Sequence, residues 1–249
     1  MKYYDLSPAE REQRKEEIKS LILAAIPTGG NSILEMLFSD DDTHTRKVAY
    51  LELSKIYISN DAFRPEILSI LNKYIAHSDE KVRQTVVYAS GEIAAKNFAV
   101  VEHLIEKGLL DTHHSVRNAS TGALKTAGNK NPAVLDFCKK HIQSSEAEVR
   151  RLICHGLELR GRTHPQEIIH LLQELQHDTH KRVIDMLIHV LGQISYKKGC
   201  FYFVFEQVKK WGNEEILSRY KDEVIEVHER YAKFSDLSVD AVRDILLQL

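Results

Sequence analysis

Apolar residues recur every three or four positions along most of the chain. Val82, Val86, Ala89 and Ile93 are one example, and Val149, Leu152, Ile153 and Leu157 are another. A period of 3.6 residues places such side chains on one face of an α-helix. The pattern therefore predicts a succession of amphipathic helices and an all-α fold.

A short acidic or polar turn followed by an arginine recurs before these helices. Neighbouring arginines lie roughly 32 to 37 residues apart, the length of one helix-turn-helix unit. A second amphipathic segment precedes each of the last four turns. The turns start at Asp40, Asp79, Asp111, Glu146 and Asp178, the arginines are Arg46, Arg83, Arg117, Arg150 and Arg182, and the second segments are 67–75, 100–105, 134–142 and 168–175. We predict two helices per repeat, an outer one followed by an inner one.

The boundaries of the predicted helices carry capping residues. Ser7 and Glu10 form a capping-box pattern with a proline between them in the first turn, and Ser145 with Glu148 offers a second box. Only segment 27–30 has the composition of a genuine loop, so we predict no linker. We expect one repeat domain over 1–249, with an N-terminal capping helix in 1–32, helix pairs in 33–212 and a C-terminal cap in 213–249.

One helix pair cannot bury its apolar face alone, so stability must come from the stacking of neighbouring pairs. We therefore predict a right-handed superhelical solenoid of about six antiparallel helix pairs. Four of the repeated arginines, Arg46, Arg83, Arg117 and Arg150, are interpreted as structural residues that bind the carboxylates and carbonyls of the turns.

An acidic turn followed by Val-Arg at the start of an inner helix resembles the HEAT-repeat family. Val82-Arg83, Val116-Arg117 and Val149-Arg150 match this pattern, whereas Arg46 and Arg182 depart from it in the residues that flank them. The resemblance extends from about residue 33 to 212. It implies a HEAT-like, armadillo-type α-solenoid and carries almost no information on function.

Composition excludes few functions. The 249 residues are 43% hydrophobic and 28% charged, with a net charge of -2, so a folded protein is expected and neither nucleic acid nor protein is favoured as a partner. The longest apolar run, 200–205, is too short to span a bilayer, and the N-terminus lacks the apolar core of a signal peptide. We expect a cytoplasmic protein that does not bind membranes.

Segment 148–156, EVRRLICHG, is similar to DNA-alkylation-repair proteins with HEAT-like folds, and 190–196, VLGQISY, with Trp211 downstream, resembles another of their segments. In that family, acidic residues stand where this chain has His155 and Gln193. Such glycosylases need a carboxylate to stabilise the positive charge that develops on the sugar. The departure argues against catalysis, and we expect no enzymatic activity.

Sequence patterns typical of metal-binding sites are also weak in this chain. Deoxyhypusine-hydroxylase-like HEAT proteins bind iron through repeated His-Glu dyads, and only His228-Glu229 has that order here. His177 and His180 are three residues apart, but we expect them to straddle the turn between two helices as a solvated pair. No cofactor and no metal site is predicted.

Several polar residues fall in or beside successive inner helices, where they could form a positive stripe; the alternative is that they only solvate the surface. These candidates for binding a partner or nucleic acid are Arg151, His155, Arg160, Arg162, Lys181, Arg182, Gln193, Lys197 and Lys198. Our leading hypothesis is a non-enzymatic scaffold whose concave groove binds a protein partner. The alternative is a DNA-binding protein related to HEAT-like alkylpurine DNA glycosylases, with weak or no activity. The pattern does not indicate an oligomeric state.

Overall fold

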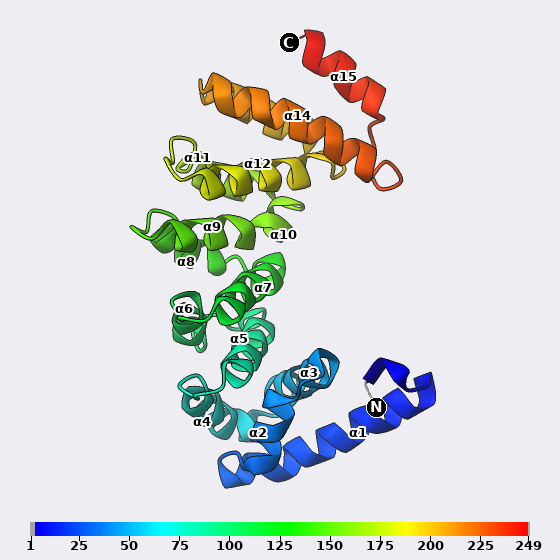
Figure 1. The fold of residues 1–249 in the computed structure, drawn as a ribbon, viewed down its shortest axis with the longest axis vertical. Coiled ribbons are helices and arrows are strands. Elements are labelled where there is room, and N and C mark those ends of the chain that lie inside the picture. The colour runs from blue at the N-terminus through cyan, green and yellow to red at the C-terminus, as the bar shows by residue number, and fades with distance from the viewer. Residues whose placement is uncertain (1–2, 249) are drawn as a thin grey trace. The chain divides into compact units, whose positions relative to one another are not determined.

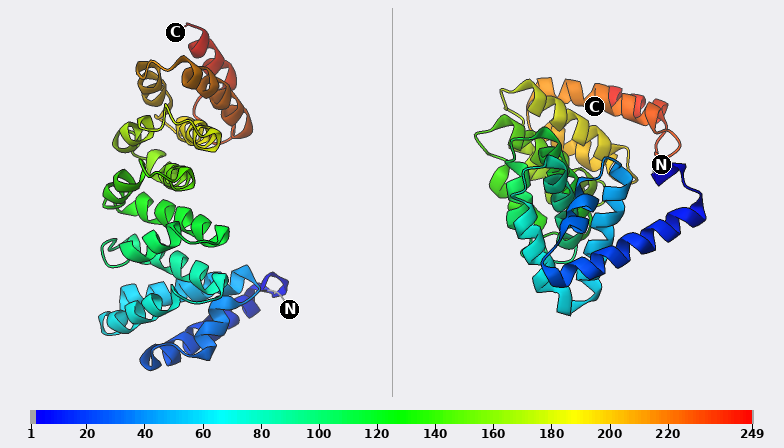
Figure 2. Two further views of the ribbon diagram at one scale, coloured as in Figure 1. Left: turned by 60° about the vertical axis from the view of Figure 1, so that its left-hand side comes forward. Right: turned by 60° about the horizontal axis from the view of Figure 1, so that its bottom comes forward.

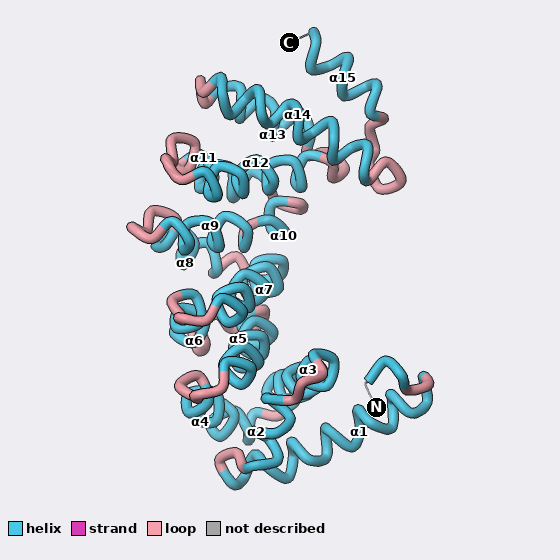
Figure 3. The backbone as a smooth tube through the Cα atoms, viewed as in Figure 1, coloured by secondary structure: helices cyan, strands magenta, loops and turns pink. Residues whose placement is uncertain are grey.

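In the computed structural model, which describes residues 3–248, the regular elements of that range are all helices (Figures 1 and 3). The predicted all-α fold is confirmed. Short 3-10 helices occur at Tyr3–Asp5, Ile26–Thr28 and Asp61–Phe63.

Twelve of the described α-helices form consecutive outer and inner pairs. The outer helices are α2 (Ser32–Ser39), α4 (Arg64–Tyr74), α6 (Glu102–Leu109), α8 (Val134–His141), α11 (Pro165–Gln173) and α13 (Phe201–Lys210). The inner helices are α3 (Thr43–Ser59), α5 (Glu80–Ala94), α7 (His114–Lys130), α9 (Ala147–Gly156), α12 (Lys181–Ser195) and α14 (Glu214–Arg230). The short helix α10 (Glu158–Gly161) follows α9, while α1 (Pro8–Ala25) precedes the first pair and α15 (Val239–Gln248) follows the last.

The chain forms two compact units, one ending at Ala127 and the other beginning at Gly128, so the division falls within α7. In the first unit, α3 packs against α5, and α1 packs against α2 and α3. In the second unit, α12 packs between α9 and α14, and α11 contacts α8 and α13 (Figure 2). Inner helices thus pack on inner helices in both units, and outer helices pack on outer helices in the second unit, which is the arrangement of a solenoid.

The inner helices bury the faces that the sequence pattern predicts. Val82, Val86, Ala89 and Ile93 of α5 are fully buried, and the corresponding residues of α9 are almost completely buried. Each buried valine, leucine or isoleucine side chain among them contributes on the order of 1.5–3 kcal/mol when it leaves water. The residues that the apolar pattern places on the inward face of these helices therefore belong to the core.

Close approach of two inner helices in the first unit depends on Gly91. A Cβ atom at this position would lie 2.5 Å from the Cα atom of Ala123 on α7, which is too short for any side chain. Glycine at residue 91 therefore lets the backbones of α5 and α7 approach closely.

The predicted capping box at the start of α1 is present, whereas the one predicted at the start of α9 is absent. Ser7 and Glu10 form the expected capping box at the start of α1. No side chain caps α9, whose N-cap residue is Glu146 rather than Ser145. The carboxylate of Glu148 instead binds the guanidinium of Arg151, and it is therefore directed away from the backbone of the helix start.

The acidic turns act as helix N-caps. The carboxylate of Asp42 accepts a hydrogen bond from the backbone N–H of His44 at 2.9 Å, and that of Asp79 accepts one from Lys81 at 2.7 Å. A side-chain acceptor at this position satisfies an N–H that the helix leaves unbonded.

Among the described helices, none is long and apolar enough to cross a membrane.

Candidate binding surface on the inner helices

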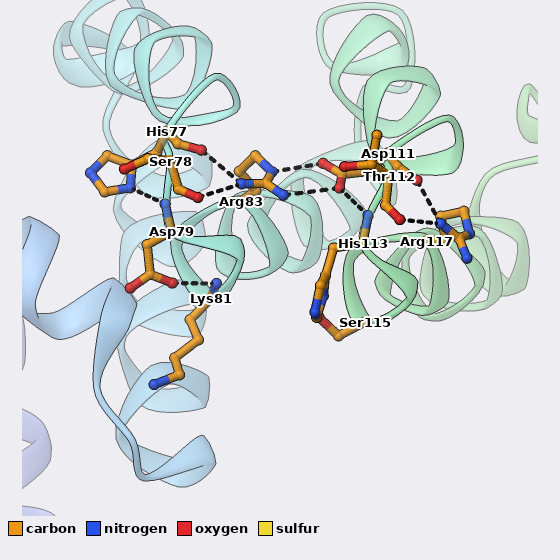
Figure 4. A network of polar contacts seen from close by, with 10 residues as sticks. All are labelled: His77, Ser78, Asp79, Lys81, Arg83, Asp111, Thr112, His113, Ser115 and Arg117. Atoms are coloured by element: carbon orange, nitrogen blue, oxygen red, sulfur yellow. Dashed lines mark hydrogen bonds and ion pairs between the residues drawn. The ribbon is translucent and has the colours of Figure 1, made fainter.

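A repeated arginine connects the turns of the first unit. The guanidinium of Arg83 donates two hydrogen bonds to the carboxylate of Asp111, at 2.7 and 3.0 Å, and also donates to the backbone carbonyls of His77 and Ser78 (Figure 4). Arg117 donates to the carbonyls of Asp111 and Thr112. Arg46 donates to the carbonyl of Asp40. These arginines bind the turn ahead of their own helix, and Arg83 also binds the next turn.

Arg150 makes the same contacts in the second unit. Its guanidinium binds the carboxylate of Asp178 at 2.5 and 3.0 Å and the carbonyl of Ser144 at 2.7 Å. Burial opposes ionisation of Asp178, but the hydrogen bonds from Arg150 and from the backbone N–H of His180 outweigh it, so the pKa of this carboxyl lies below its ordinary value. The carboxylate form is thus the one that the fold stabilises.

Polar side chains follow one stripe on each inner helix of the second unit, at helical spacing. We call these stripes the second inner surface. It comprises Glu148, Arg151 and His155 of α9, Glu158 of α10 and Arg162 directly after it, Lys181, Arg182, Asp185, His189 and Gln193 of α12 and Tyr196 and Lys197 directly after it, and Arg219 and Glu223 of α14.

One end of the second inner surface alternates in charge. Glu148 pairs with Arg151 at 2.8 Å and lies 3.6 Å from Arg182 of the neighbouring helix. Asp185 pairs with both Lys181 and Arg219 at 2.6 Å. Hydrogen bonding to Lys181 and then to Arg219 lowers the pKa of Asp185. The cations here are thus bound to carboxylates of their own or neighbouring helices.

The middle of the surface holds a buried carboxylate between two histidines. Only 7% of the Glu158 side chain is exposed. One of its oxygens binds Arg162 at 2.6 Å, and the other lies 3.3 Å from Nε2 of His155 and 4.0 Å from Nε2 of His189. Arg162 also donates to the side-chain carbonyl of Gln193 at 2.6 Å.

Aromatic rings lie at the other end of the surface. Tyr196 stacks on Tyr231, with ring centroids 4.8 Å apart. The ammonium of Lys197 lies 4.5 Å from the centroid of the Tyr196 ring, and the guanidinium of Arg162 lies 5.5 Å from it. Cations at these distances are attracted to the face of the ring.

The first unit has a separate cleft between α3 and α5. Tyr50 and Tyr88 stack there with centroids 5.3 Å apart, beside Arg46, Lys47 and Gln84. The cleft has a volume of about 200 Å³. Burial, and then the negative charge of Glu92, raises the pKa of Tyr50 to about 12, so its hydroxyl remains protonated and can donate a hydrogen bond.

The predicted candidates separate into three groups. Arg151, Lys181 and Arg182 lie at the charged end of the second inner surface, and His155, Arg162, Gln193 and Lys197 lie at its middle and aromatic end. Arg160 does not belong to the surface, because its guanidinium pairs at 2.6 Å with Glu167 on the outer helix α11. Lys198 is exposed in the turn after α12.

The sequence pattern did not single out Glu158, His189, Glu223 or the two tyrosine pairs. Glu158 lies three residues after His155 and His189 four before Gln193, so spacing from these predicted positions could have indicated both. Glu223 lies in the segment assigned to the C-terminal cap. In the structure, that segment contains α14, which packs against α12 and α13.

Comparisons with known proteins identify the fold. No protein-family model matches the chain, and a comparison with curated proteins also finds no match. Among solved structures, AlkD2 from Streptococcus mutans is similar at a TM-score of 0.56 and 22% identity, covering 82% of this chain and 96% of its own. The protein smu.31 from Streptococcus mutans UA159 is similar at 0.55 and 20%, covering 82% and 98%.

A larger protein is similar over much of the same range. One chain in a structure of the Pds5-Scc1 complex is similar at a TM-score of 0.51 and 12% identity. The match covers 90% of this chain and 38% of the chain in that complex. Together with the paired helices, these similarities establish the fold class. The chain is a HEAT/armadillo-like α-solenoid.

Proposed function

We propose that the chain is a non-enzymatic scaffold that binds an extended segment of a partner protein on its inner helices. The observation that carries this proposal is the pairing of cations on the second inner surface. Arg151, Arg162 and Arg219 each bind a carboxylate at 2.6–2.8 Å. Binding to the phosphate backbone of a nucleic acid depends on lysine and arginine side chains that are available to replace the counterions of the phosphates. A surface of alternating charge instead suits the mixed charges and backbone groups of a polypeptide.

The tyrosine cleft of the first unit supports the same proposal. Tyr50 and Tyr88 are half-buried and stacked, so they offer an apolar face at little entropic cost. Tyrosine is enriched at protein interfaces for this reason. Arg46 and Gln84 border the cleft, and the guanidinium of Arg46 donates to the side-chain carbonyl of Gln84 at 3.3 Å, so the tyrosine face has a polar rim.

The proposal is tested by selecting peptides from a random displayed library against the purified chain. We expect the selected peptides to converge on one sequence pattern and to lose at least about fivefold in affinity for a Tyr88→Ala variant, the loss expected of an interface aromatic worth more than about 1 kcal/mol. Tyr202→Ala is the matched control, because Tyr202 is 56% exposed on the outer helix α13. Peptides that fail to converge, or that bind both variants equally, would refute peptide binding in this cleft.

DNA binding is the second candidate, and one observation favours it. Arg182 and Lys198 are exposed, and Lys181 is exposed although it contacts Asp185. A titration with fluorescent duplex DNA at two salt concentrations separates the candidates. If the scaffold proposal holds, binding is weak at low salt and disappears at moderate salt. Micromolar or tighter binding that falls steeply with salt and is weakened by Arg182→Ala would instead support the DNA-binding alternative.

A further inference from the structure

Three potential metal ligands converge at the middle of the second inner surface. His155 comes from the last turn of α9, Glu158 begins α10 and His189 lies on α12. One nitrogen of each histidine and one oxygen of Glu158 all lie within 4.8 Å of one another. Two of these separations, from the Glu158 oxygen to the Nε2 atoms of His155 and His189, are 3.3 and 4.0 Å.

These separations are close to those of a zinc site. Zn²⁺ binds histidine nitrogen and carboxylate oxygen at about 2.0–2.2 Å in tetrahedral geometry, which places neighbouring ligand atoms about 3.3 Å apart. The separation from His155 already has this value, and that from His189, at 4.0 Å, requires a closer approach of about 0.7 Å. We propose that His155, Glu158 and His189 bind one Zn²⁺ ion and leave its fourth position open to the surface.

The residues around the three ligands have the arrangement of an outer shell. Arg162 binds the oxygen of Glu158 that faces away from the histidines, at 2.6 Å, so the other oxygen is directed toward them. Nδ1 of His189 lies 3.7 Å from the carboxylate of Glu223. A carboxylate that hydrogen-bonds to the second ring nitrogen orients a metal-binding histidine and makes it a stronger ligand, and Glu223 lies beside that nitrogen within ion-pair but beyond hydrogen-bond distance.

Gly192 makes room for this outer carboxylate. A Cβ atom at residue 192 would lie 2.5 Å from Cγ of Glu223, so any larger residue would displace the glutamate from its place beside His189. Histidine and carboxylate ligands suit zinc among the divalent ions, whereas Mg²⁺ and Ca²⁺ take oxygen ligands. Glu158 is nearly buried and the two histidines are partly exposed, so an ion can enter from the surface. The inference does not depend on the proposed function.

The site is tested with the full chain, free of any affinity tag and treated with a chelator. The protein competes with a chromogenic chelator for added Zn²⁺. We expect one equivalent to bind at micromolar or lower dissociation constant, and His155→Ala and His189→Ala each to abolish that equivalent. His177→Ala and His180→Ala are matched controls, because these histidines lie in the segment between α11 and α12, outside the cluster, and these variants should bind as the unchanged protein does.

Two further measurements separate metal binding from folding. Circular dichroism shows whether each variant retains its helices, and Glu223→Gln should keep one equivalent while losing about 10- to 100-fold in affinity, as expected of an outer-shell change. Co²⁺, which is strongly coloured in tetrahedral sites, should give a visible spectrum that the folded His189→Ala variant lacks. The inference is overturned if the unchanged chain binds less than one equivalent, or if both folded histidine variants bind as tightly as it does.

Discussion

The Arg150–Asp178 pair lies between a surface ion pair and a buried one, since the side chain of Asp178 is 4% exposed and that of Arg150 is 18% exposed. Exposed pairs contribute less than about 1 kcal/mol, whereas hydrogen bonds to a charged, desolvated group contribute about 1.5–3 kcal/mol. We therefore expect Arg150→Ala to lower the free energy of unfolding by about 2 kcal/mol, measured by urea denaturation.

A control for this prediction is Arg230→Ala. Arg230 lies 3.9 Å from Glu226, and both side chains are more than half exposed, so its removal should change the free energy by less than about 0.5 kcal/mol. Equal midpoints for Arg150→Ala and the unchanged chain would show that packing alone holds the turn.

The same pair predicts a dependence on pH. The pKa of Asp178 is lower in the folded chain than its ordinary value, so folding favours the carboxylate. This contribution is complete above the unfolded pKa of about 3.9 and is lost as the pH falls through the folded pKa. The difference in stability between the unchanged chain and Arg150→Ala should therefore be full at pH 7 and shrink below about pH 4. A constant difference down to pH 2.5 would show that the charge of Asp178 does not matter.

Single residues show which part of the surface the sequence could predict. Arg151 and Arg162 were predicted because they fall in or beside successive inner helices, and Gln193 because it stands where a resembling family has an acidic residue. The approach of Glu223 to His189 depends on the packing of α14 against α12 and on the space above Gly192. A pattern within one helix does not contain that information, because it does not specify which residue of the next helix lies opposite.

At the scale of helices, spacing between backbones is set by small residues. Gly91→Ala places a methyl group 2.5 Å from the backbone of Ala123, so α5 and α7 must move apart. Alanine would otherwise favour the helix by about 1 kcal/mol. We expect the overpacking to exceed this gain, with a net loss of about 1–2 kcal/mol in the free energy of unfolding.

Gly128→Ala provides a matched comparison. Its added methyl group would meet a side-chain methyl of Val134 at 3.2 Å, which can move by a few tenths of an ångström, and Cβ of Arg160 at an ordinary contact distance of 3.8 Å. Thermal denaturation of the two variants should show Gly91→Ala melting at the lower temperature. If both melt at the same temperature, the close approach of α5 and α7 does not require a glycine.

A capping box could be predicted from the sequence where its two residues bind each other and no nearby side chain competes with the backbone for the carboxylate. Ser7 and Glu10 cap α1 through two reciprocal hydrogen bonds between residues only three positions apart. The Ser145–Glu148 box fails because Arg151, one turn along the same helix, takes the carboxylate. The sequence pattern identified both residues of that ion pair. It could not show whether the carboxylate of Glu148 binds the guanidinium of Arg151 or a backbone N–H at the start of the helix.

At the scale of the whole chain, the predicted number of about six helix pairs agrees with the pairs in the described range. This agreement has a physical basis, since each pair must bury its apolar face on the next one and the spacing of repeats is therefore strict. The division at residue 127, which falls within a helix, has no linker to mark it in the sequence. Stability should depend on contacts between neighbours rather than on one central core.

This dependence can be tested at the first helix. Ile22 of α1 is fully buried where α1 packs on α2 and α3. Ile22→Glu would bury an unpaired carboxylate, which costs several kcal/mol or forces α1 away from its neighbours. Because each pair in an array is stabilised by those beside it, we expect amide hydrogen exchange to increase most in α1, α2 and α3 and progressively less in each following pair.

Leu23→Glu is the control for this experiment, because Leu23 is adjacent in sequence and 36% exposed, so its exchange pattern should remain close to that of the unchanged chain. A uniform increase along α1 to α14 in the Ile22→Glu variant would mean that the chain unfolds in a single cooperative step. Stability would then be a property of the whole chain, and the contacts between adjacent pairs would not be its units.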